Sequence, residues 1–406
     1  MILGTVLFAQ TGEPAADPLV LKLAVIGPGD ELYFWWGHIG LIVEDYEAGE
    51  SRFYDWGVFS FENENFFANF AFGRLLYACM VTSAEWNIGN YIAANRTITL
   101  YTLDLPVSVK KEITAFAEWN VRPENRDYFY HHFKDNCATR IRDILDAALG
   151  GQFKARYGEA PGRYTLRQHI RRHTYFNPFF DWILNFWMGQ DIDTPITIWE
   201  EMFLPAEIGL RAAEFSYAGS GGLERKLVSS VETINAAQGR PPVLDAPRRQ
   251  WPEEFALGLV IALALGLLLI FRNRGSRAAE VIWALCQGIL GLFFGATGLV
   301  LFFMTFFTNH DYTYHNINII FINPLLLAAL PLGIAFLKTN CSSTRARLEL
   351  AVKILWSYVF VFGLLSLPLR LLPFFWQQNQ VTLALVLPFA AVLSLLPGLI
   401  KGIFRK

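Results

Sequence analysis

Two residues of this chain have the chemistry of a nucleophile and its base. Cys137 lies in the string DNCATRIRDILDAALGG, and His38 lies in WWGHIGLIVEDYEAGESRFYDWG. A cysteine thiolate attacks acyl carbons, and an imidazole beside it takes and returns the proton. If Asp55 holds the imidazole by its second nitrogen, the three residues form an arrangement that suits acyl chemistry.

The residues around Cys137 predict that it lies in the first turn of a helix. Asp135 or Asn136 is a suitable N-cap, apolar residues follow at helical spacing, and a Gly-Gly pair ends the element. Free backbone N–H groups and the helix dipole favour an anion there, and therefore the thiolate. The alternative is that Cys137 is a small buried apolar residue at a helix start.

The segment around His38 predicts a β-hairpin, with two β-rich runs joined by a polar turn. We assume a register in which Glu44 lies opposite Ser51. Antiparallel pairing then places Gly40 opposite Asp55, so that His38 and Asp55 project from the same face as diagonal neighbours. The alternative is a surface imidazole on an ordinary hairpin.

Other polar residues are candidates for contacts with a substrate. Two flank Cys137, although Arg140 is also explained by a solvated helix face. The rest adjoin apolar segments or, in the case of Arg370, lie inside one, and polar groups there are costly and either face a partner or cap the segment. The candidates are Asn136, Arg140, His310, His315, Asn316, Asn318 and Arg370.

Three pairs of residues resemble fragments of other sites, and each has a more ordinary explanation. The pairs are His131 with His132, His169 with His173, and Asp191 with Asp193. A histidine pair in an aromatic loop usually packs, histidines four apart need a third ligand, and a DxD string before proline usually forms a turn. We therefore expect no metal and no cofactor.

The distribution of apolar residues predicts a membrane domain. Up to about residue 252 the charges are dispersed, and no uncharged run reaches the ~18 residues that a span requires. Five long apolar segments follow, at roughly 255–271, 281–307, 319–337, 354–376 and 381–400. The sequence thus predicts an all-α bundle of five transmembrane helices.

Basic residues between these segments predict the orientation. The connections 308–318 and 377–380 contain no lysine or arginine. The other connections and the tail contain Arg272, Arg274, Arg277, Lys338, Arg345, Arg347, Lys353, Lys401, Arg405 and Lys406. Because basic residues stay on the cytoplasmic side, we expect a cytoplasmic C-terminus and an N-terminal domain outside the membrane.

These signals divide the chain into four parts. We predict an apolar leader or truncated signal peptide at 1–18, a catalytic domain at 19–204, a linker at 205–250 and the five-span domain at 251–406. The catalytic domain is expected to be α+β, with a small antiparallel sheet packed on the helix of Cys137. Cys79, in the alternating run LLYACMV, is expected to be a buried strand residue. A net charge of −2 without a basic stripe argues against nucleic acid as a partner.

A histidine on a hairpin followed by an Asn-Cys pair that opens a helix resembles the permuted papain-like arrangement of LRAT-like acyltransferases and phospholipases. Five strings in order resemble the Lnb type of lipoprotein N-acyltransferase of Bacteroidota and relatives. They are WGHIGL, FYDWGVFSFENENFFANFAFGRLLY, DNCATRIRDILD, MGQDIDTPITIWEEMFLP and FTNHDYTYHNINIIFINPL.

The resemblance implies a protein of the bacterial inner membrane with a periplasmic N-terminal domain, and a reaction with two lipid substrates. Cys137 would take an acyl chain from a phospholipid as a thioester, and the N-terminal amine of a diacylated lipoprotein would accept it, with His38 transferring protons. Two other hypotheses stay open. One is a membrane-tethered cysteine hydrolase, such as a phospholipase, peptidase or amidase, and the other is a non-catalytic envelope assembly protein.

Overall fold

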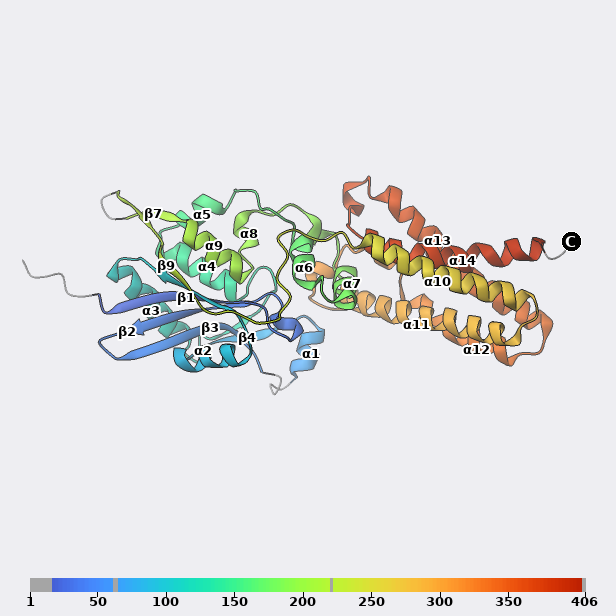
Figure 1. Cartoon of the computed structure of the whole chain (residues 1–406), viewed down its shortest axis with the longest axis horizontal. Helices are drawn as coiled ribbons and strands as arrows, with labels where there is room; N and C mark the ends of the chain where they lie inside the picture. The colour runs from blue at the N-terminus through green and yellow to red at the C-terminus, as the bar shows by residue number, and fades with distance from the viewer. Residues whose placement is uncertain (1–16, 61–64, 220–221, 404–406) are drawn as a thin grey trace, which may run out of the picture. The chain divides into compact units, whose positions relative to one another are not determined.

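The computed structural model describes residues 17–60, 65–219 and 222–403 (Figure 1). All but the last two residues of the predicted leader, 1–18, lie outside these ranges. The chain divides into two compact units. The sheet unit contains Met1–Ser60, Leu76–Ala160 and Thr197–Arg240, and the helical unit contains Phe61–Leu75, Pro161–Ile196 and Pro241–Lys406.

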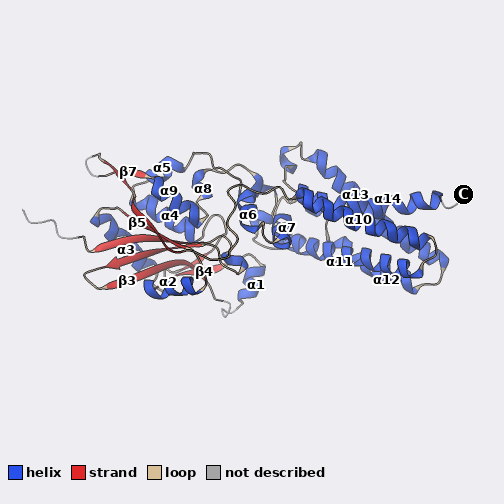
Figure 2. Ribbon diagram, in the orientation of Figure 1, coloured by secondary structure: helices blue, strands red, loops and turns tan. Residues whose placement is uncertain are grey.

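The sheet unit is built on a seven-stranded sheet with the order β6-β4-β3-β2-β1-β5-β9 (Figure 2). Every neighbouring pair is antiparallel. The strands are β1 (Leu19–Ile26), β2 (His38–Asp45), β3 (Glu50–Val58), β4 (Leu76–Ser83), β5 (Ile98–Leu103), β6 (Asp127–Phe129) and β9 (Val228–Asn235). The prediction of an α+β domain with an antiparallel sheet is confirmed, although the sheet is larger than expected.

Helices cover both faces of this sheet because its strands alternate apolar side chains between two cores. One core joins Leu21, Leu41 and Trp56 to helices α3 (Val107–Asn120), α4 (Cys137–Ala148), α5 (Gln152–Tyr157) and α9 (Pro205–Glu214). The smaller core joins Ile42 and Phe53 to α2 (Ala84–Ala93). Cys79 is fully buried on β4, as predicted.

Residues 205–250 are not simply a linker, so this boundary was wrong. They contain α9, the short hairpin of β7 (Ser216–Ala218) and β8 (Glu224–Lys226), and the edge strand β9. The helix α8 (Ile198–Glu201) precedes them. The sequence signal of β9 is weak because only Val228 at its start is buried, while most of its other side chains are exposed at the edge of the sheet.

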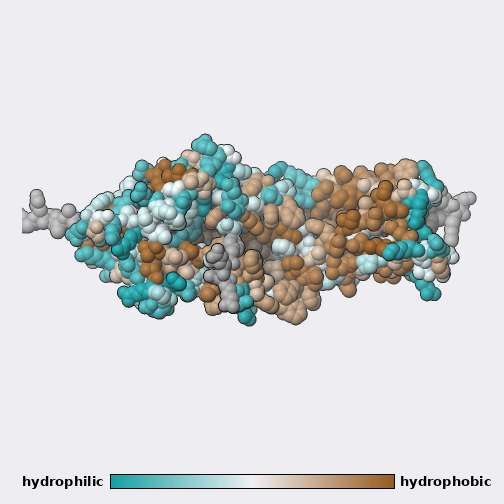
Figure 3. Space-filling model, turned by 90° about the horizontal axis from the view of Figure 1, so that it is seen from below, coloured by the Kyte–Doolittle hydropathy of each residue, from teal (hydrophilic) through white to brown (hydrophobic). Residues whose placement is uncertain are grey.

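The described part of the helical unit has two groups of α-helices, three short ones and five apolar ones. The shorter ones are α1 (Phe66–Ala71), α6 (Leu166–Thr174) and α7 (Pro178–Trp187). The apolar ones are α10 (Trp251–Asn273), α11 (Arg277–Phe307), α12 (Ala329–Lys338), α13 (Ser342–Leu369) and α14 (Gln380–Ile403). Figure 3 shows that hydrophobic residues form most of the surface over these apolar helices.

Among the described residues, three helices are long and apolar enough to cross a membrane, namely α10, α11 and α13. The fourth predicted segment, 354–376, was shifted, because α13 starts at Ser342 and ends at Leu369, four residues before Pro373. The segment Pro324–Lys338 and the part of α14 within Gln380–Leu396 are shorter apolar helices. Within the described residues three helices thus have spanning length, and a bundle of five spans stays a prediction.

The third predicted segment, 319–337, is interrupted and not one α-helix. Short 3-10 turns occupy Ile317–Ile320 and Pro324–Ala328 before α12 begins. Asn323 starts a new turn by accepting the backbone N–H of Leu325, and Pro324 cannot donate to the preceding turn. Glycines of α11 let this irregular backbone approach closely, since a Cβ at Gly298 would meet the backbone of Asn323.

A buried ion pair fixes the polar part of the helical unit. Arg167 and Asp193 are fully buried and joined by two hydrogen bonds, of 2.6 and 3.0 Å. Arg167 also donates to the carbonyls of Asn185, Met188 and Gly189. Asp193, the second aspartate of the DxD string, is thus a structural counter-ion for Arg167 and not only part of a turn.

Removing the Asp193 carboxylate would leave the Arg167 charge buried without its partner. We expect Asp193→Ala to lower the free energy of unfolding by about 3–5 kcal/mol, which thermal unfolding in detergent measures as a large fall in Tm. Asp191→Ala is the matched control, because its pair with His315 is partly exposed and should contribute less than about 1 kcal/mol. Equal losses in both variants would contradict this assignment.

Candidate active site

The predicted hairpin register is confirmed. In β2 and β3, Glu44 lies opposite Ser51 and Gly40 lies opposite Asp55. His38 and Asp55 meet on one face, where the imidazole Nε2 donates to the carboxylate Oδ1 at 2.7 Å. Both side chains are mostly buried, at 13% and 15% exposure. The carboxylate therefore fixes the tautomer of His38 and leaves Nδ1 for proton transfer.

Cys137 is the first residue of α4, as predicted, and Asn136 is the N-cap. The Asn136 side-chain oxygen accepts the backbone N–H groups of Ala138 and Thr139, both at 2.9 Å. Its amide nitrogen donates to the carbonyls of His132 and Phe203. Asn136 is 5% exposed and all its hydrogen bonds are internal, so its role in the site is to position Cys137.

Gly57, at the end of β3, is where the nucleophile and the base come together. A Cβ on this residue would lie 3.5 Å from Cε1 of His38 and 3.7 Å from Cβ of Cys137. Its φ of +128° is a conformation that only glycine adopts readily. Within the described residues no hydrogen bond joins the Cys137 sulfur to His38, a separation that is common in free enzymes and shortens with substrate.

The environment of His38 favours its charged form. Burial by itself lowers the pKa of the imidazole, but the Asp55 carboxylate outweighs burial, and Tyr91 and Cys137 add to its effect. The pKa of His38 is therefore raised well above its usual value. A protonated imidazole at this position can donate its proton to a leaving group.

Residues next to Cys137 that were candidates for substrate contacts have partners in the sheet unit. Arg140 forms a two-pronged ion pair with Asp135, with distances of 2.7 and 2.9 Å. His131 accepts the backbone N–H groups of Phe133 and Lys134, and the ring of His132 packs edge-on against Tyr130. The histidine pair thus shapes the loop before α4.

The remaining candidates all lie in the helical unit, where they hold its irregular backbone. His310 donates to the carbonyl of Phe70, and His315 donates to Asp191. The buried amides of Asn316 and Asn318 both donate to the carbonyl of Phe186.

Arg370, another of these candidates, follows α13 and donates to the side chain of Asn379. These contacts favour the capping explanation for the two asparagines over a surface open to lipid headgroups.

The other histidine pair is structural. His169 accepts from Arg172 at 2.9 Å, and His173 donates to the carbonyl of His169 at 2.7 Å. Burial lowers the pKa of His173 to about 3, so its imidazole is neutral. The described part of the chain has no group of three or more His, Cys, Asp or Glu side chains placed to hold a metal ion.

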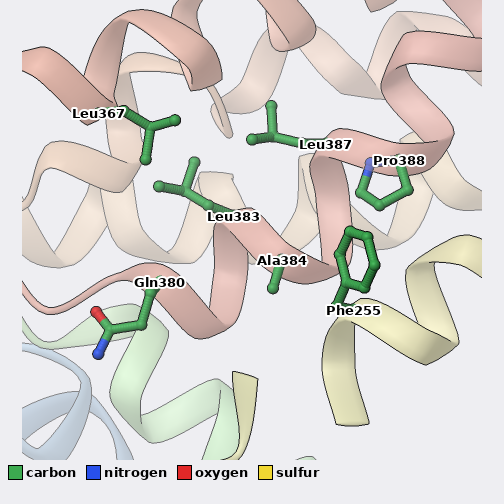
Figure 4. A pocket seen from close by; sticks show the side chains of 7 residues that line it. All are labelled: Phe255, Leu367, Gln380, Leu383, Ala384, Leu387 and Pro388. Atoms are coloured by element: carbon green, nitrogen blue, oxygen red, sulfur yellow. The ribbon is translucent and has the colours of Figure 1, made fainter. Parts of the chain in front are cut away.

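An open groove of about 440 Å³ lies between α10, α13 and α14 (Figure 4). Its walls are apolar except for Gln380. They are formed by Phe255, Leu367, Gln380, Leu383, Ala384, Leu387 and Pro388. No nucleophile or titratable group lines the groove, so it is not the site of chemistry.

The sequence did not point to several aromatic residues around Cys137 and His38. Tyr91 of α2 lies beside His38, with ring centroids 6.3 Å apart. Tyr77 and Tyr130 stack with centroids 4.2 Å apart, and Tyr128 pairs with Tyr77 across β6 and β4. The only sequence signal is the alternation of Tyr128, Tyr130 and His132 immediately before the N-cap, which resembles ordinary strand patterning.

Comparison with known proteins identifies the sheet unit. Residues 10–172 match the family model described as the Lnb N-terminal periplasmic domain. The domain that contains these residues belongs to the family of Lnb N-terminal periplasmic domains. No curated protein and no solved structure matches it.

The chain is a membrane protein with a periplasmic domain, and the family of this domain connects it to lipoprotein processing. The matched region contains Cys137, His38 and Asp55, but it ends before Thr197–Arg240, which is also part of the sheet unit. We call the sheet unit the Lnb domain.

The raised pKa of His38 makes the stability of the Lnb domain depend on pH. Stability from protonated His38 is fully present below its unfolded pKa, near 6.5, and is lost as the pH rises through the raised folded value. In a Cys137→Ala background we expect Asp55→Asn to lower stability by roughly 3 kcal/mol near pH 6, with the gap closing as the pH rises through the raised folded pKa of His38. Thermal unfolding across this range measures it, and a gap independent of pH would overturn the assignment.

Proposed function

We propose that this chain is a lipoprotein N-acyltransferase, which moves an acyl chain from a phospholipid to the N-terminal cysteine amine of a diacylated lipoprotein. The observation that supports this most is at Gly57, where His38 and Cys137 both border a position without a side chain. The order of His38 before Cys137 also agrees with a permuted papain-like arrangement. Membership of the periplasmic domain in the Lnb family supplies the link to lipoproteins.

The reaction has two steps that share one thioester. The Cys137 sulfur attacks the ester carbonyl carbon of the phospholipid, the bond to the glycerol oxygen breaks, and His38 protonates that oxygen. The lipoprotein amine then attacks the thioester carbonyl, the bond to sulfur breaks, and His38 accepts the amine proton. Because Asp55 holds Nε2, the nitrogen that exchanges these protons is Nδ1.

Anchoring in the membrane suits both substrates. Phospholipids and diacylated lipoproteins are held in the bilayer, and α10, α11 and α13 are long and apolar enough to fix the enzyme to the same surface. Reactants confined to one surface meet without either being extracted, which lowers the entropic cost of the encounter. No metal or other cofactor enters this scheme.

We also propose that the protein is in the bacterial inner membrane with its C-terminus in the cytoplasm. Two ion pairs join the basic connections of the helical unit, Arg345 with Glu280 and Arg272 with Glu349. The connections α10–α11 and α12–α13 therefore share one end of that unit. Gathering of basic residues at one end is typical of the cytoplasmic side.

Intact-mass analysis of the purified protein with phospholipid alone tests the first step. We expect an acyl adduct on the wild type and none on Cys137→Ala, with His38→Ala slowed by about 10²-fold or more because the thiol loses its base. Adding a synthetic diacylated lipopeptide should discharge the adduct and leave the lipopeptide with one more amide-linked chain.

Cys79→Ala is the matched control, since this second thiol of the Lnb domain is buried on β4 and should not affect the adduct. Discharge of the adduct only to water would favour the cysteine hydrolase. The absence of both adduct and product with every phospholipid tested would favour an envelope assembly protein.

The orientation is tested at Cys341, which is exposed and immediately precedes α13. A membrane-impermeant maleimide should label this thiol only after spheroplasts are permeabilised. Peptide mapping identifies the labelled residue, and Cys341→Ser removes the signal. Labelling of Cys341 in intact spheroplasts would reverse the proposed topology.

A further inference from the structure

Three phenols lie on the paired strands β4 and β6 and in the segment that leads from β6 to the helix of Cys137. Tyr77 is on β4, Tyr128 is on β6, and Tyr130 follows β6. Burial raises the pKa of each, that of Tyr77 to about 12, and negative charge at Cys137 raises all three further. At neutral pH these side chains are therefore O–H donors within electrostatic reach of the nucleophile.

The hydroxyl of Tyr128 differs from most buried polar groups. It is enclosed by protein, its residue is only 8% exposed, and among the described residues it has no hydrogen-bond partner. A buried hydroxyl without a hydrogen-bond partner destabilises the folded protein. Such groups are rare in folded proteins, and those that persist need a functional or structural explanation.

The position of Tyr128 is fixed against the start of α4. The guanidinium of Arg140 lies over the Tyr128 ring, 3.8 Å from its centroid. Arg140 is one turn along the helix from Cys137, and its bidentate pair with Asp135 holds it there. The Tyr128 side chain of β6 therefore packs, through Arg140, against the first turn of the helix that begins with Cys137.

Backbone donors near the sulfur are mostly occupied. The first N–H groups of a helix have no acceptor in a preceding turn, and they often stabilise the oxyanion formed in acyl transfer. In α4, the N–H groups of Ala138 and Thr139 already donate to Asn136. Among the described residues, the N–H of Cys137 is the one backbone donor of this first turn without an acceptor, and oxyanion sites commonly use more than one donor.

We propose that the Tyr128 hydroxyl donates a hydrogen bond to the oxyanion that forms when Cys137 attacks an acyl group, and that it does so together with the Cys137 N–H. The proposal rests on the proposed function, since it requires an acyl substrate. When the carbon–sulfur bond forms, the carbonyl π electrons move to oxygen, and Tyr128 stabilises that charge without giving up its proton. When the intermediate collapses, the carbonyl reforms and the leaving group departs.

Tyr128→Phe tests this, because it removes one oxygen and keeps the ring under Arg140. We expect the rate constant of adduct formation at saturating phospholipid to fall by about 10²- to 10³-fold, the usual loss of one oxyanion donor, with half-saturation nearly unchanged. The Tm should be unchanged or higher, since the hydroxyl has no partner to lose. A purely structural role would leave the rate constant unchanged, and that result would overturn the proposal.

Tyr157→Phe is the matched control. Tyr157 is buried in the core that contains Cys137, and its phenol donates to the carbonyl of Arg211, so loss of its hydroxyl should leave adduct formation unchanged. Failure of the wild type to form an adduct would refute the proposed function itself. Normal adduct formation by both the wild type and Tyr128→Phe would refute only the role of Tyr128.

Discussion

The position of Cys137 depends on one amide side chain. Asn136 accepts two backbone N–H groups from the first turn of α4 and donates to carbonyls from two other segments, at His132 and Phe203. These four hydrogen bonds fix where the helix begins and hold that point against the rest of the Lnb domain. The hairpin of His38 can then lie close to Cys137, because Gly57 has no side chain to separate them.

The parts of the site that the sequence predicted are those set by local rules. The register of β2 and β3 follows from a short turn and from strand alternation, so the pairing of His38 with Asp55 could be predicted from the sequence alone. The start of α4 follows from an N-cap and helical spacing, which are likewise local signals. We expected His38 and Cys137 to meet because of their chemistry and because of the family resemblance. That they meet at Gly57 is seen only in the structure.

The parts that were missed depend on contacts between distant residues. β9 has few apolar residues, and it is a strand only because β5 offers it an unpaired edge. The segment 319–337 has the composition of a membrane helix, yet Pro324 and the asparagine caps break it where the glycines of α11 allow close approach. The sequence around Tyr128 is typical of an ordinary strand. Its unpaired hydroxyl depends on contacts in the folded structure and cannot be predicted from the sequence.

The placement of β9 also has a consequence for how the protein is made. The strand β9 is the outermost strand on one side of the sheet, and it pairs with β5. The first strand of the sheet begins at Leu19, whereas β9 ends at Asn235, shortly before α10 starts at Trp251. During synthesis almost the whole periplasmic segment must emerge before the sheet can be completed, and the first apolar helix follows soon afterwards. Closure of the sheet and entry of α10 into the bilayer are therefore consecutive events, and the edge of β5 stays open until they occur.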